Sequence, residues 1–285
     1  MIKNIVKLFY IWCLKTIQNM KWFVQYCQAK HQKLYPAQLT RLKLDKDEKL
    51  VVLVPHADDE WIGPYSIIKD CPQKLCCVYF NLFGNDYSEK NIRTRNSEIK
   101  ASSDYWGFKL VNNYNYDVEV LCMELKNASK CFVPSPYDWH KEHRKVFQTF
   151  VKAYNILDES ERIKLEVYYF CVSLPHSYKE PQYYVPLTKK NLYDKWQVFP
   201  RIYHSQAFMP ALRYKLQLKL VPSDIGYAAQ TFIKASMDKL MEDYKLVGTS
   251  YVSRKLGDLQ KHINNIVDSR RILVQVKREI KNENN

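Results

Sequence analysis

Runs of apolar residues alternate with stretches of helical spacing through the middle of the chain. Residues 49–55 are almost continuously aliphatic and β-branched, which is typical of a strand buried on both faces of a parallel sheet. Residues 75–80 and 165–173 predict further strands, and residues 91–106 and 139–155 predict helices between them. This alternation indicates an α/β fold with a mostly parallel sheet flanked by helices.

The two ends of the chain have a different pattern. Residues 1–44 combine basic residues with apolar ones spaced by three or four, as in an amphipathic helix. After about residue 223 the spacing is helical with mixed charge, over 227–244 and 254–281, without a strand-like run. We therefore expect three parts: a basic helical segment over 1–44, a Rossmann-like α/β domain over 45–222 and a helical C-terminal extension over 223–285.

Charge is concentrated at the beginning of the chain. The net charge is +14, and residues 1–43 hold eight Lys or Arg and no acid, so this segment should seek an anionic surface. The stretch free of charge between Lys7 and Lys15 is seven residues, too short for a transmembrane helix or a signal peptide. We expect an interfacial helix on an anionic membrane surface. The alternative is a helix that packs on the domain, with its lysines in solvent.

The eight cysteines form no Cys-x-x-Cys pair and no regular framework. Several lie in strand-like runs, where a thiol behaves as a small apolar side chain. This usage indicates a reducing compartment, and a zinc site made of thiolates is not expected. The expected location is cytoplasmic, with peripheral attachment to the inner face of the membrane through residues 1–43.

A cluster of polar residues directly follows the first predicted strand. Residues 55–60 read Pro-His-Ala-Asp-Asp-Glu. Ligands bind beyond the carboxyl ends of strands in open α/β sheets, so a histidine and three acids are well placed there. If the chain turns into a helix, His56 and Asp59 face the same side and can share a metal, while Asp58 is directed elsewhere.

A second cluster, Asp138-Trp139-His140-Lys141-Glu142-His143, opens the predicted helix over 139–155. Asp138 is a candidate N-cap, and the two histidines are then one turn apart on the side that continues the apolar stripe. Two neutral imidazoles and a carboxylate, with positions left for water, are typical of a catalytic zinc site. A further carboxylate beside such a metal would be its natural base.

Together the two clusters resemble the LmbE/PIG-L family of zinc-dependent de-N-acetylases. Arg95-Asn-Ser-Glu98, followed by Trp106-Gly107, resembles the family's R-x-x-E helix and turn, and Ser205-Gln206 resembles a weaker feature. The resemblance covers about residues 48–210. The chain departs from the family at three places. Ala57 stands where the family usually has Pro, Lys141-Glu142 where it has Pro-Asp, and Gly63-Pro64 where it has Gly-Gly.

The resemblance implies roles at matching positions. It implies three zinc ligands: His56, Asp59 and His143. It implies two catalytic side chains: Asp58 as general base and His140, protonated, as the group that stabilises the oxyanion. It implies two contacts to the sugar: Arg95 and Asp117.

The implied reaction is hydrolysis of an N-acetyl group. Zinc would activate water and polarise the amide carbonyl, and the products would be acetate and a free amino sugar. Because the N-terminal segment would bring the domain to a membrane, the expected substrate is an N-acetyl-hexosamine of the GlcNAc type in a glycolipid, lipid-linked saccharide or related glycoconjugate.

Two other readings stay open. In a metal-dependent nucleotide-sugar glycosyltransferase, Asp58 and Asp59 would hold a divalent metal ion on a diphosphate. This alternative gives the three histidines no role, because Mg²⁺ and Mn²⁺ prefer oxygen ligands. A non-enzymatic basic protein would bind membrane or nucleic acid. The 22 tyrosines do not gather with Lys or Arg into an RNA-binding motif, so nucleic acid is not an expected partner. The pattern does not address the oligomeric state.

Overall fold

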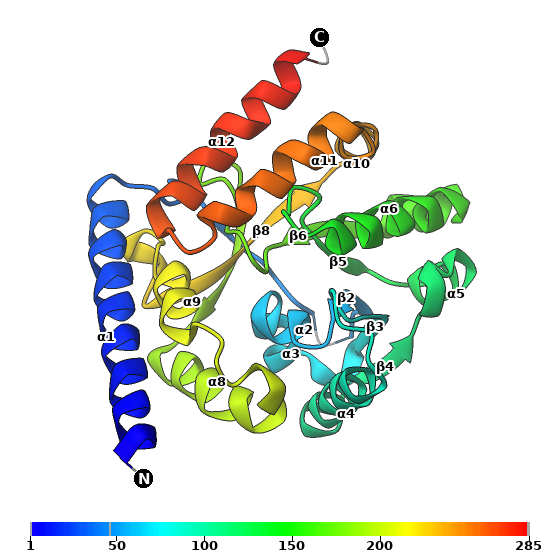
Figure 1. Cartoon of the computed structure of the whole chain (residues 1–285). Helices are drawn as coiled ribbons and strands as arrows, with labels where there is room; N and C mark the ends of the chain where they lie inside the picture. Colours follow the sequence, from blue (N-terminus) through cyan, green and yellow to red (C-terminus); the bar gives the residue numbers. More distant parts are fainter. Residues whose placement is uncertain (1, 46, 284–285) are drawn as a thin grey trace.

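One mixed sheet of eight strands organises the computed structural model, which describes residues 2–45 and 47–283 (Figure 1). The strand order is β1-β7-β8-β6-β5-β2-β3-β4. From β6 to β4 all neighbours are parallel, whereas β8 is antiparallel to both β6 and β7. The predicted α/β class with a mostly parallel sheet is confirmed. The strands are β1 (Thr40–Arg41), β2 (Leu50–His56), β3 (Leu75–Leu82), β4 (Lys109–Asn112), β5 (Lys130–Pro134), β6 (Glu166–Phe170), β7 (Tyr183–Leu187) and β8 (Ala228–Ala235).

Helices cover both faces of this sheet, because the central strands are apolar on both sides. From β2, Val51 and Leu53 enter a core shared with α5, α6 and α10 to α12, and Val52 and Val54 enter a second core shared with α2, α3, α4 and α8. The helices are α1 (Ile2–His31), α2 (Asp59–Ile62), α3 (Tyr65–Asp70), α4 (Glu89–Trp106), α5 (Val118–Leu125), α6 (Lys141–Ile156), α7 (Glu159–Lys164), α8 (Lys189–Ile202), α9 (Ala211–Leu218), α10 (Met237–Val247), α11 (Ser250–Gly257) and α12 (Ile266–Glu283).

The C-terminal part contains a strand where the sequence pattern predicts a helix. Residues 228–235 form β8, inserted between β6 and β7, so the prediction of a helix over 227–244 and of a purely helical part after 222 is wrong over this strand. Its alanines favour a helix, and burial on both faces removes the alternation that marks a strand. Pairing with two neighbours therefore decides the conformation. From Met237 onward the part is helical, as predicted.

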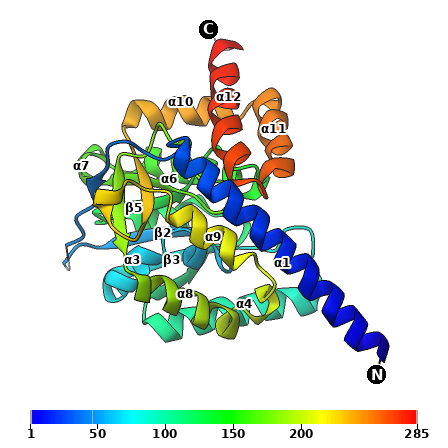
Figure 2. The same cartoon turned by 90° about the vertical axis from the view of Figure 1, so that its left-hand side faces the viewer.

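The N-terminal segment contains one 30-residue helix over residues 2–31, as predicted, but the expected helical part does not extend to residue 44, because Thr40–Arg41 form β1 and pair with β7. Trp22 and Ala29 of α1 pack with Leu216 of α9 and Ile266 of α12, and the Trp22 indole N–H donates to the Asn264 carbonyl at 2.9 Å. Figure 2 shows α1 crossing over α9 and continuing past the body of the protein. Across the described residues, we find no helix with the length and apolarity needed to traverse a bilayer.

The sheet reverses its direction of growth between β2 and β5. The chain moves outward from β2 through β3 to β4, then returns to β5 on the other side of β2 and continues to β6. Loops that leave the carboxyl ends of two such strands diverge and open a crevice, which is the usual ligand site of an open α/β sheet. His56 ends β2 and His140 precedes α6, which follows β5. The topology thus brings both polar clusters to one place.

Candidate metal centre

A tight turn at the end of β2 aims two side chains at one point. Asp58 is the N-cap of α2 and has φ 118° and ψ −20°, a left-handed conformation that is unfavourable for a residue with a Cβ. Asp59 opens the helix, and its Oδ2 accepts the backbone N–H of His56 at 2.8 Å and lies 3.2 Å from His56 Nδ1. The predicted common orientation of His56 and Asp59 is present, and the Asp58 carboxylate pairs instead with Arg95.

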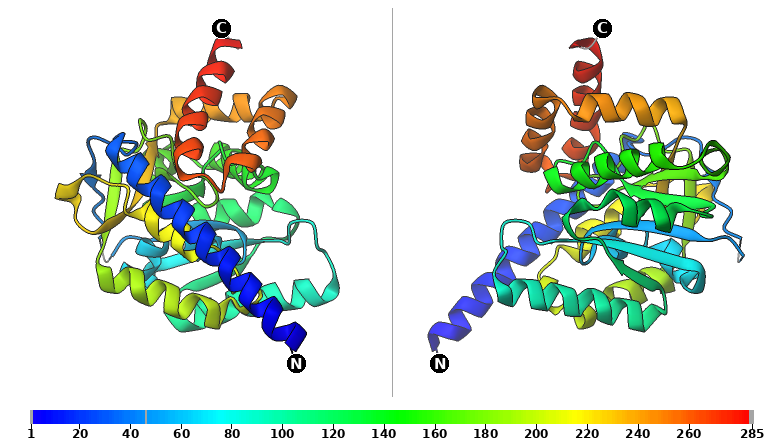
Figure 3. Two further views of the ribbon diagram at one scale, coloured as in Figure 1. Left: turned by 60° about the vertical axis from the view of Figure 1, so that its left-hand side comes forward. Right: turned by 90° about the vertical axis from the view of Figure 1, so that its right-hand side faces the viewer.

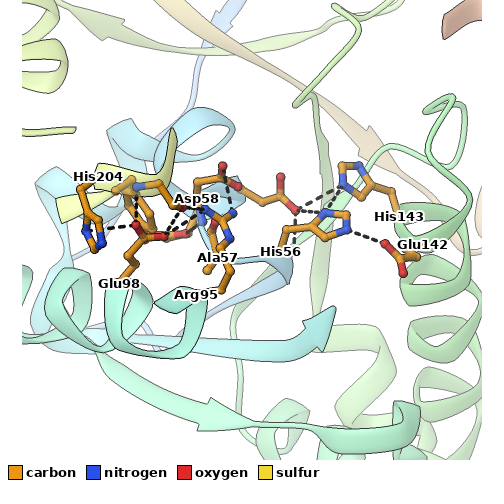
Figure 4. A network of polar contacts seen from close by, with 12 residues as sticks. His56, Ala57, Asp58, Arg95, Glu98, Glu142, His143 and His204 are labelled. Carbon is orange, nitrogen blue, oxygen red and sulfur yellow. Dashed lines mark hydrogen bonds and ion pairs between the residues drawn. The ribbon is translucent and has the colours of Figure 1, made fainter. Parts of the chain in front are cut away.

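His143 of α6 meets this pair from the other side of the crevice (Figure 4). Its Nε2 lies 3.1 Å from His56 Nδ1 and 3.2 Å from Asp59 Oδ2. In a tetrahedral zinc site with bonds of about 2.0–2.1 Å, neighbouring ligand atoms are about 3.3 Å apart. We call these three atoms the ligand triangle. Its spacing fits one face of such a coordination shell.

A carboxylate lies at the outer nitrogen of each of these histidines. His56 Nε2 is 2.6 Å from Glu142 Oε2, and His143 Nδ1 is 3.2 Å from Asp138 Oδ2. Each carboxylate favours a proton on the nitrogen that it faces, which leaves the lone pair of the inward nitrogen for a metal. Glu142 is held in turn by the Tyr87 hydroxyl, which donates to Oε1 at 3.0 Å.

The charges around the ligand triangle favour a cation. Burial lowers the pKa of His143, but the carboxylates of Asp59 and Asp138 outweigh it and raise that pKa to about 10. Burial raises the pKa of Asp59, but His143 and His56 hold it well below its usual range. Both shifts show that the site stabilises positive charge where the three atoms meet.

His140 completes a group of three histidines with His56 and His143 that could hold a metal ion, their nitrogens lying within 4.8 Å of one another. Its Nδ1 accepts the Glu142 backbone N–H at 3.3 Å as the N-cap of α6, so a neutral ring carries its proton on Nε2. Burial and the two neighbouring imidazoles lower the pKa of His140 to about 4. These surroundings favour a neutral His140, whereas the resemblance implies a protonated one.

Asp58 lies next to the ligand triangle and pairs with Arg95 of α4. Its Oδ2 is 3.1 Å from Arg95 Nη2, and Arg95 also donates to the Ala57 carbonyl. Burial raises the pKa of Asp58 to about 6, with Arg95 acting in the opposite direction. Arg95 is only 6% exposed, so its clearest structural role is to hold the Asp58 carboxylate.

Glu98 connects Arg95 to the loop that follows α8 (Figure 4). Its Oε2 is 3.1 Å from Arg95 Nη1, and Ser205 donates to Glu98 from its backbone N–H at 2.7 Å and from its hydroxyl at 2.8 Å. The ring of His204 lies 3.2 Å from the same carboxylate. The Arg-x-x-Glu pattern and Ser205 therefore form one network of polar contacts that holds the Asp58 carboxylate in place.

An open pocket of about 420 Å³ contains the site. A volume of this order is typical of small-molecule sites. Its walls combine the two clusters with the loop over residues 83–86 and with side chains near α9. The site residues in its wall are His56, Asp58, Asp59, Arg95, His140 and His143.

Asp117 is separate from this group. Its carboxylate accepts the backbone N–H groups of Glu119 and Val120 as the N-cap of α5, and it does not line the pocket. A second difference concerns Asp138, which was a candidate N-cap. His140 caps α6 instead, and Asp138 faces His143.

Sequence reasoning missed the partner acids Glu142 and Asp138 as site residues. Both lie inside the second cluster, so their position beside His143 was a usable signal, but which acid faces which ring depends on the three-dimensional approach of α6 to β2.

No protein-family model and no curated protein sequence matches the chain, so a functional conclusion rests on the geometry of this site.

Proposed function

We propose that the protein is a zinc-dependent hydrolase that removes the N-acetyl group from an N-acetyl-hexosamine of the GlcNAc type in a glycoconjugate. The observation that carries this proposal is the ligand triangle of His56, Asp59 and His143, with the buried carboxylate of Asp58 beside it. The resemblance of the two motifs to zinc de-N-acetylases supports the choice of substrate.

The donor set supports zinc over a harder ion. Two imidazole nitrogens and one carboxylate oxygen are common ligands of catalytic zinc, whereas magnesium and calcium sites are built from oxygen. The chemistry supplied by a bound zinc ion is Lewis acidity, which makes water more acidic and an amide carbonyl more electrophilic. The outer carboxylates of Glu142 and Asp138 support the same assignment, because each lies at the outer nitrogen of one imidazole and favours a proton there.

Asp58 is the proposed general base. Its carboxylate accepts a proton from the attacking water, and the same proton then passes to the nitrogen of the departing amine. A bond forms between the water oxygen and the carbonyl carbon, the C–N bond breaks, and the amino sugar leaves together with acetic acid, which ionises to acetate. Arg95 keeps the carboxylate in position throughout, through its contact at 3.1 Å. Proton transfer by a positioned group typically contributes about 10²–10⁴-fold to the rate.

His140 is the proposed donor to the amide oxygen as negative charge develops there. The backbone N–H of Glu142 occupies Nδ1, so Nε2–H is free to donate from a neutral ring. A neutral donor suffices for this role, because oxyanion donors in enzymes are often neutral N–H groups. Removing one such donor typically reduces kcat by about 10²–10³.

Zinc content and acetate release together test the proposal. We expect about one zinc per chain, acetate release from at least one member of a panel of N-acetylated sugars, and loss of that release with a chelator. His143→Ala should lose the metal, and His31→Ala, at an exposed position on α1, should keep it. Full zinc occupancy in His143→Ala would contradict the ligand assignment, and a zinc-loaded protein inactive on the whole panel would contradict the reaction.

A further inference from the structure

A second cavity, of about 70 Å³, lies beside the pocket of the candidate metal centre. Ile62, Val172 and Tyr214 line both spaces, so the two are neighbours. The rest of the wall comes from α9, α12, β8 and the connection between β6 and β7. Figure 3 shows α1 crossing α9 beside the start of α12. A water molecule takes up about 30 Å³ in the liquid, so this volume suits about two waters or one small polyatomic ion.

A buried guanidinium without an acidic partner lines this cavity. Arg270 of α12 is 6% exposed. Its Nη1 donates to the Leu34 carbonyl at 3.0 Å and its Nη2 to the Gln217 carbonyl at 3.3 Å. Its Nε has no hydrogen-bond partner within residues 2–45 and 47–283, and no carboxylate of these residues forms an ion pair with it. A buried cation is costly unless an anion replaces its hydration.

A second unused donor lies on the same wall. The Nε2 amide of Gln217 is buried and also lacks a partner among the described residues. The neighbouring Gln230 differs, because it donates to the Ile62 carbonyl at 3.2 Å and accepts the Ser66 backbone N–H at 2.6 Å. A buried N–H group without an acceptor lowers stability. The cavity therefore combines one charged and one neutral donor, both of which need an acceptor.

The electrostatic field in the cavity is positive. Burial lowers the pKa of His176, in the cavity wall, to about 3, and the charges of Lys277 and Arg270 act in the same direction. A field that opposes a proton on an imidazole favours an anion in the same space. The remaining wall is mostly apolar and includes Leu174, Pro175, Leu218, Leu220, Val221 and Ala229.

We propose that this cavity binds a small carboxylate of the size of acetate, held by the Nε–H of Arg270 and the side-chain amide of Gln217. A carboxylate offers two acceptor oxygens for the two donors, and its short alkyl group suits the apolar part of the wall. The proposed reaction releases acetate in the adjoining pocket. That source of the anion rests on the proposed function, whereas the binding does not.

Thermal unfolding of the full chain in different sodium salts tests the site. Acetate at about 100 mM should raise the melting temperature by ~2 °C or more above its value in the same concentration of chloride, because a ligand that binds the folded state stabilises it. Pivalate, a carboxylate with a tert-butyl group, should be too large and should act as chloride does. Equal melting temperatures in acetate and chloride would overturn the proposal, and an equal rise with pivalate would exclude a cavity of this size as the site.

Gln217→Glu places a carboxylate beside the cavity. The new side chain should neutralise Arg270, so we expect the variant to melt at or above the wild-type temperature without acetate and to lose the acetate shift. Gln217→Met, which removes the donor without adding charge, should lose about half of the shift or more. Gln28→Glu, the same change at an exposed position of α1, should keep it. Shifts of wild-type size in both Gln217 variants would overturn the proposal, as would loss of the shift in Gln28→Glu.

A chelator separates this site from the candidate metal centre. Acetate bound to a metal at the ligand triangle would be lost with the metal, whereas the shift proposed for the cavity should persist in the chelator. Disappearance of the shift would overturn the proposal. If the shift behaves as expected but no acetylated sugar is hydrolysed, the proposed function fails and the carboxylate site stands. If sugars are hydrolysed and acetate causes no shift, the carboxylate site alone fails.

Discussion

The carboxylates beside the proposed histidine ligands decide which ring nitrogen of each histidine is available to a metal. Either nitrogen of an imidazole can bind a metal, and the partner of the other nitrogen selects which one is available. Glu142 makes this selection for His56 through a contact of 2.6 Å, and the charge of Asp138, whose Oδ2 lies 3.2 Å from Nδ1, favours a proton on that nitrogen of His143. Loss of either partner should therefore weaken a site whose three ligands are intact.

Glu142→Gln isolates this effect, because it keeps the shape and removes the charge. We expect zinc affinity to fall by about 10–100-fold, the usual consequence of removing an outer partner of a metal-binding histidine. A competition titration with a chromogenic chelator measures it. Lys141→Gln, at the exposed preceding residue, should retain the wild-type affinity. Equal affinities in the two variants would mean that Glu142 does not orient His56.

Asp58→Asn separates catalysis from metal binding. The variant should retain zinc and lose about 10² or more in kcat, because an amide cannot accept the proton. Asp117→Asn is the matched control: asparagine also caps helices well, and Asp117 does not line the pocket. We expect kcat and KM to be unchanged in this control. A raised KM would restore the sugar contact that the resemblance implies.

The sequence indicates the proposed ligands of the candidate centre better than their partners. Local geometry at a strand end suffices to predict that His56 and Asp59 face the same side, whereas the choice of His143 over His140 as the third proposed ligand rests on the resemblance. The pairing of Glu142 with His56, 86 positions away, depends on how α6 approaches β2. The low pKa of His140 depends on burial and on two other imidazoles, which no local pattern contains.

Among the elements, strands with a continuous run of apolar residues and amphipathic helices are predictable, whereas strands without such a run are not. The expected strands at 49–55, 75–80 and 165–173 correspond to β2, β3 and β6, and the expected helices correspond to α4 and α6. In contrast, the five residues of β5 include a lysine and a proline, and β8 is rich in alanine. Their conformation comes from neighbours in the sheet, which act only after the chain has folded together.

Phe232→Ala tests how much β8 contributes to the free energy of unfolding. Phe232 is fully buried and its ring lies 5.5 Å from that of Phe132 in β5, so truncation should lower the free energy of unfolding by about 3–5 kcal/mol. Urea denaturation measures the change. Phe208→Ala, at an 85% exposed position, should change stability by less than about 0.5 kcal/mol. A small effect at Phe232 would contradict the position of β8 inside the sheet.

For the whole molecule, one buried lysine should make stability depend on pH. Lys195 of α8 is 1% exposed and donates to the Ile62 carbonyl at 3.1 Å. Burial lowers the pKa of Lys195 to about 7, with Glu60 acting against it. In the unfolded chain the value is about 10.4. Between these values the unfolded chain binds a proton that the folded protein lacks, so stability should rise with pH.

The expected slope above pH 7 is about 1 kcal/mol per pH unit from this group. Urea midpoints at pH 7 and pH 9 would be compared for the wild type, Lys195→Met and Lys189→Met. The difference between wild type and Lys195→Met should shrink toward pH 9, because the free-energy cost of removing the proton that the amine carries in the unfolded chain falls as pH rises. Lys189 is exposed on the same helix, and its variant should follow the wild type. A pH-independent difference for Lys195→Met would exclude a depressed pKa.

The position of β8 also determines when the protein can fold during its synthesis. β8 alone connects β7 and β1 to the rest of the sheet, yet its last residue is Ala235. Until that residue has been made, β6 and β7 each present an open edge that other chains can pair with. A ribosome that pauses before β8 would therefore hold an aggregation-prone intermediate.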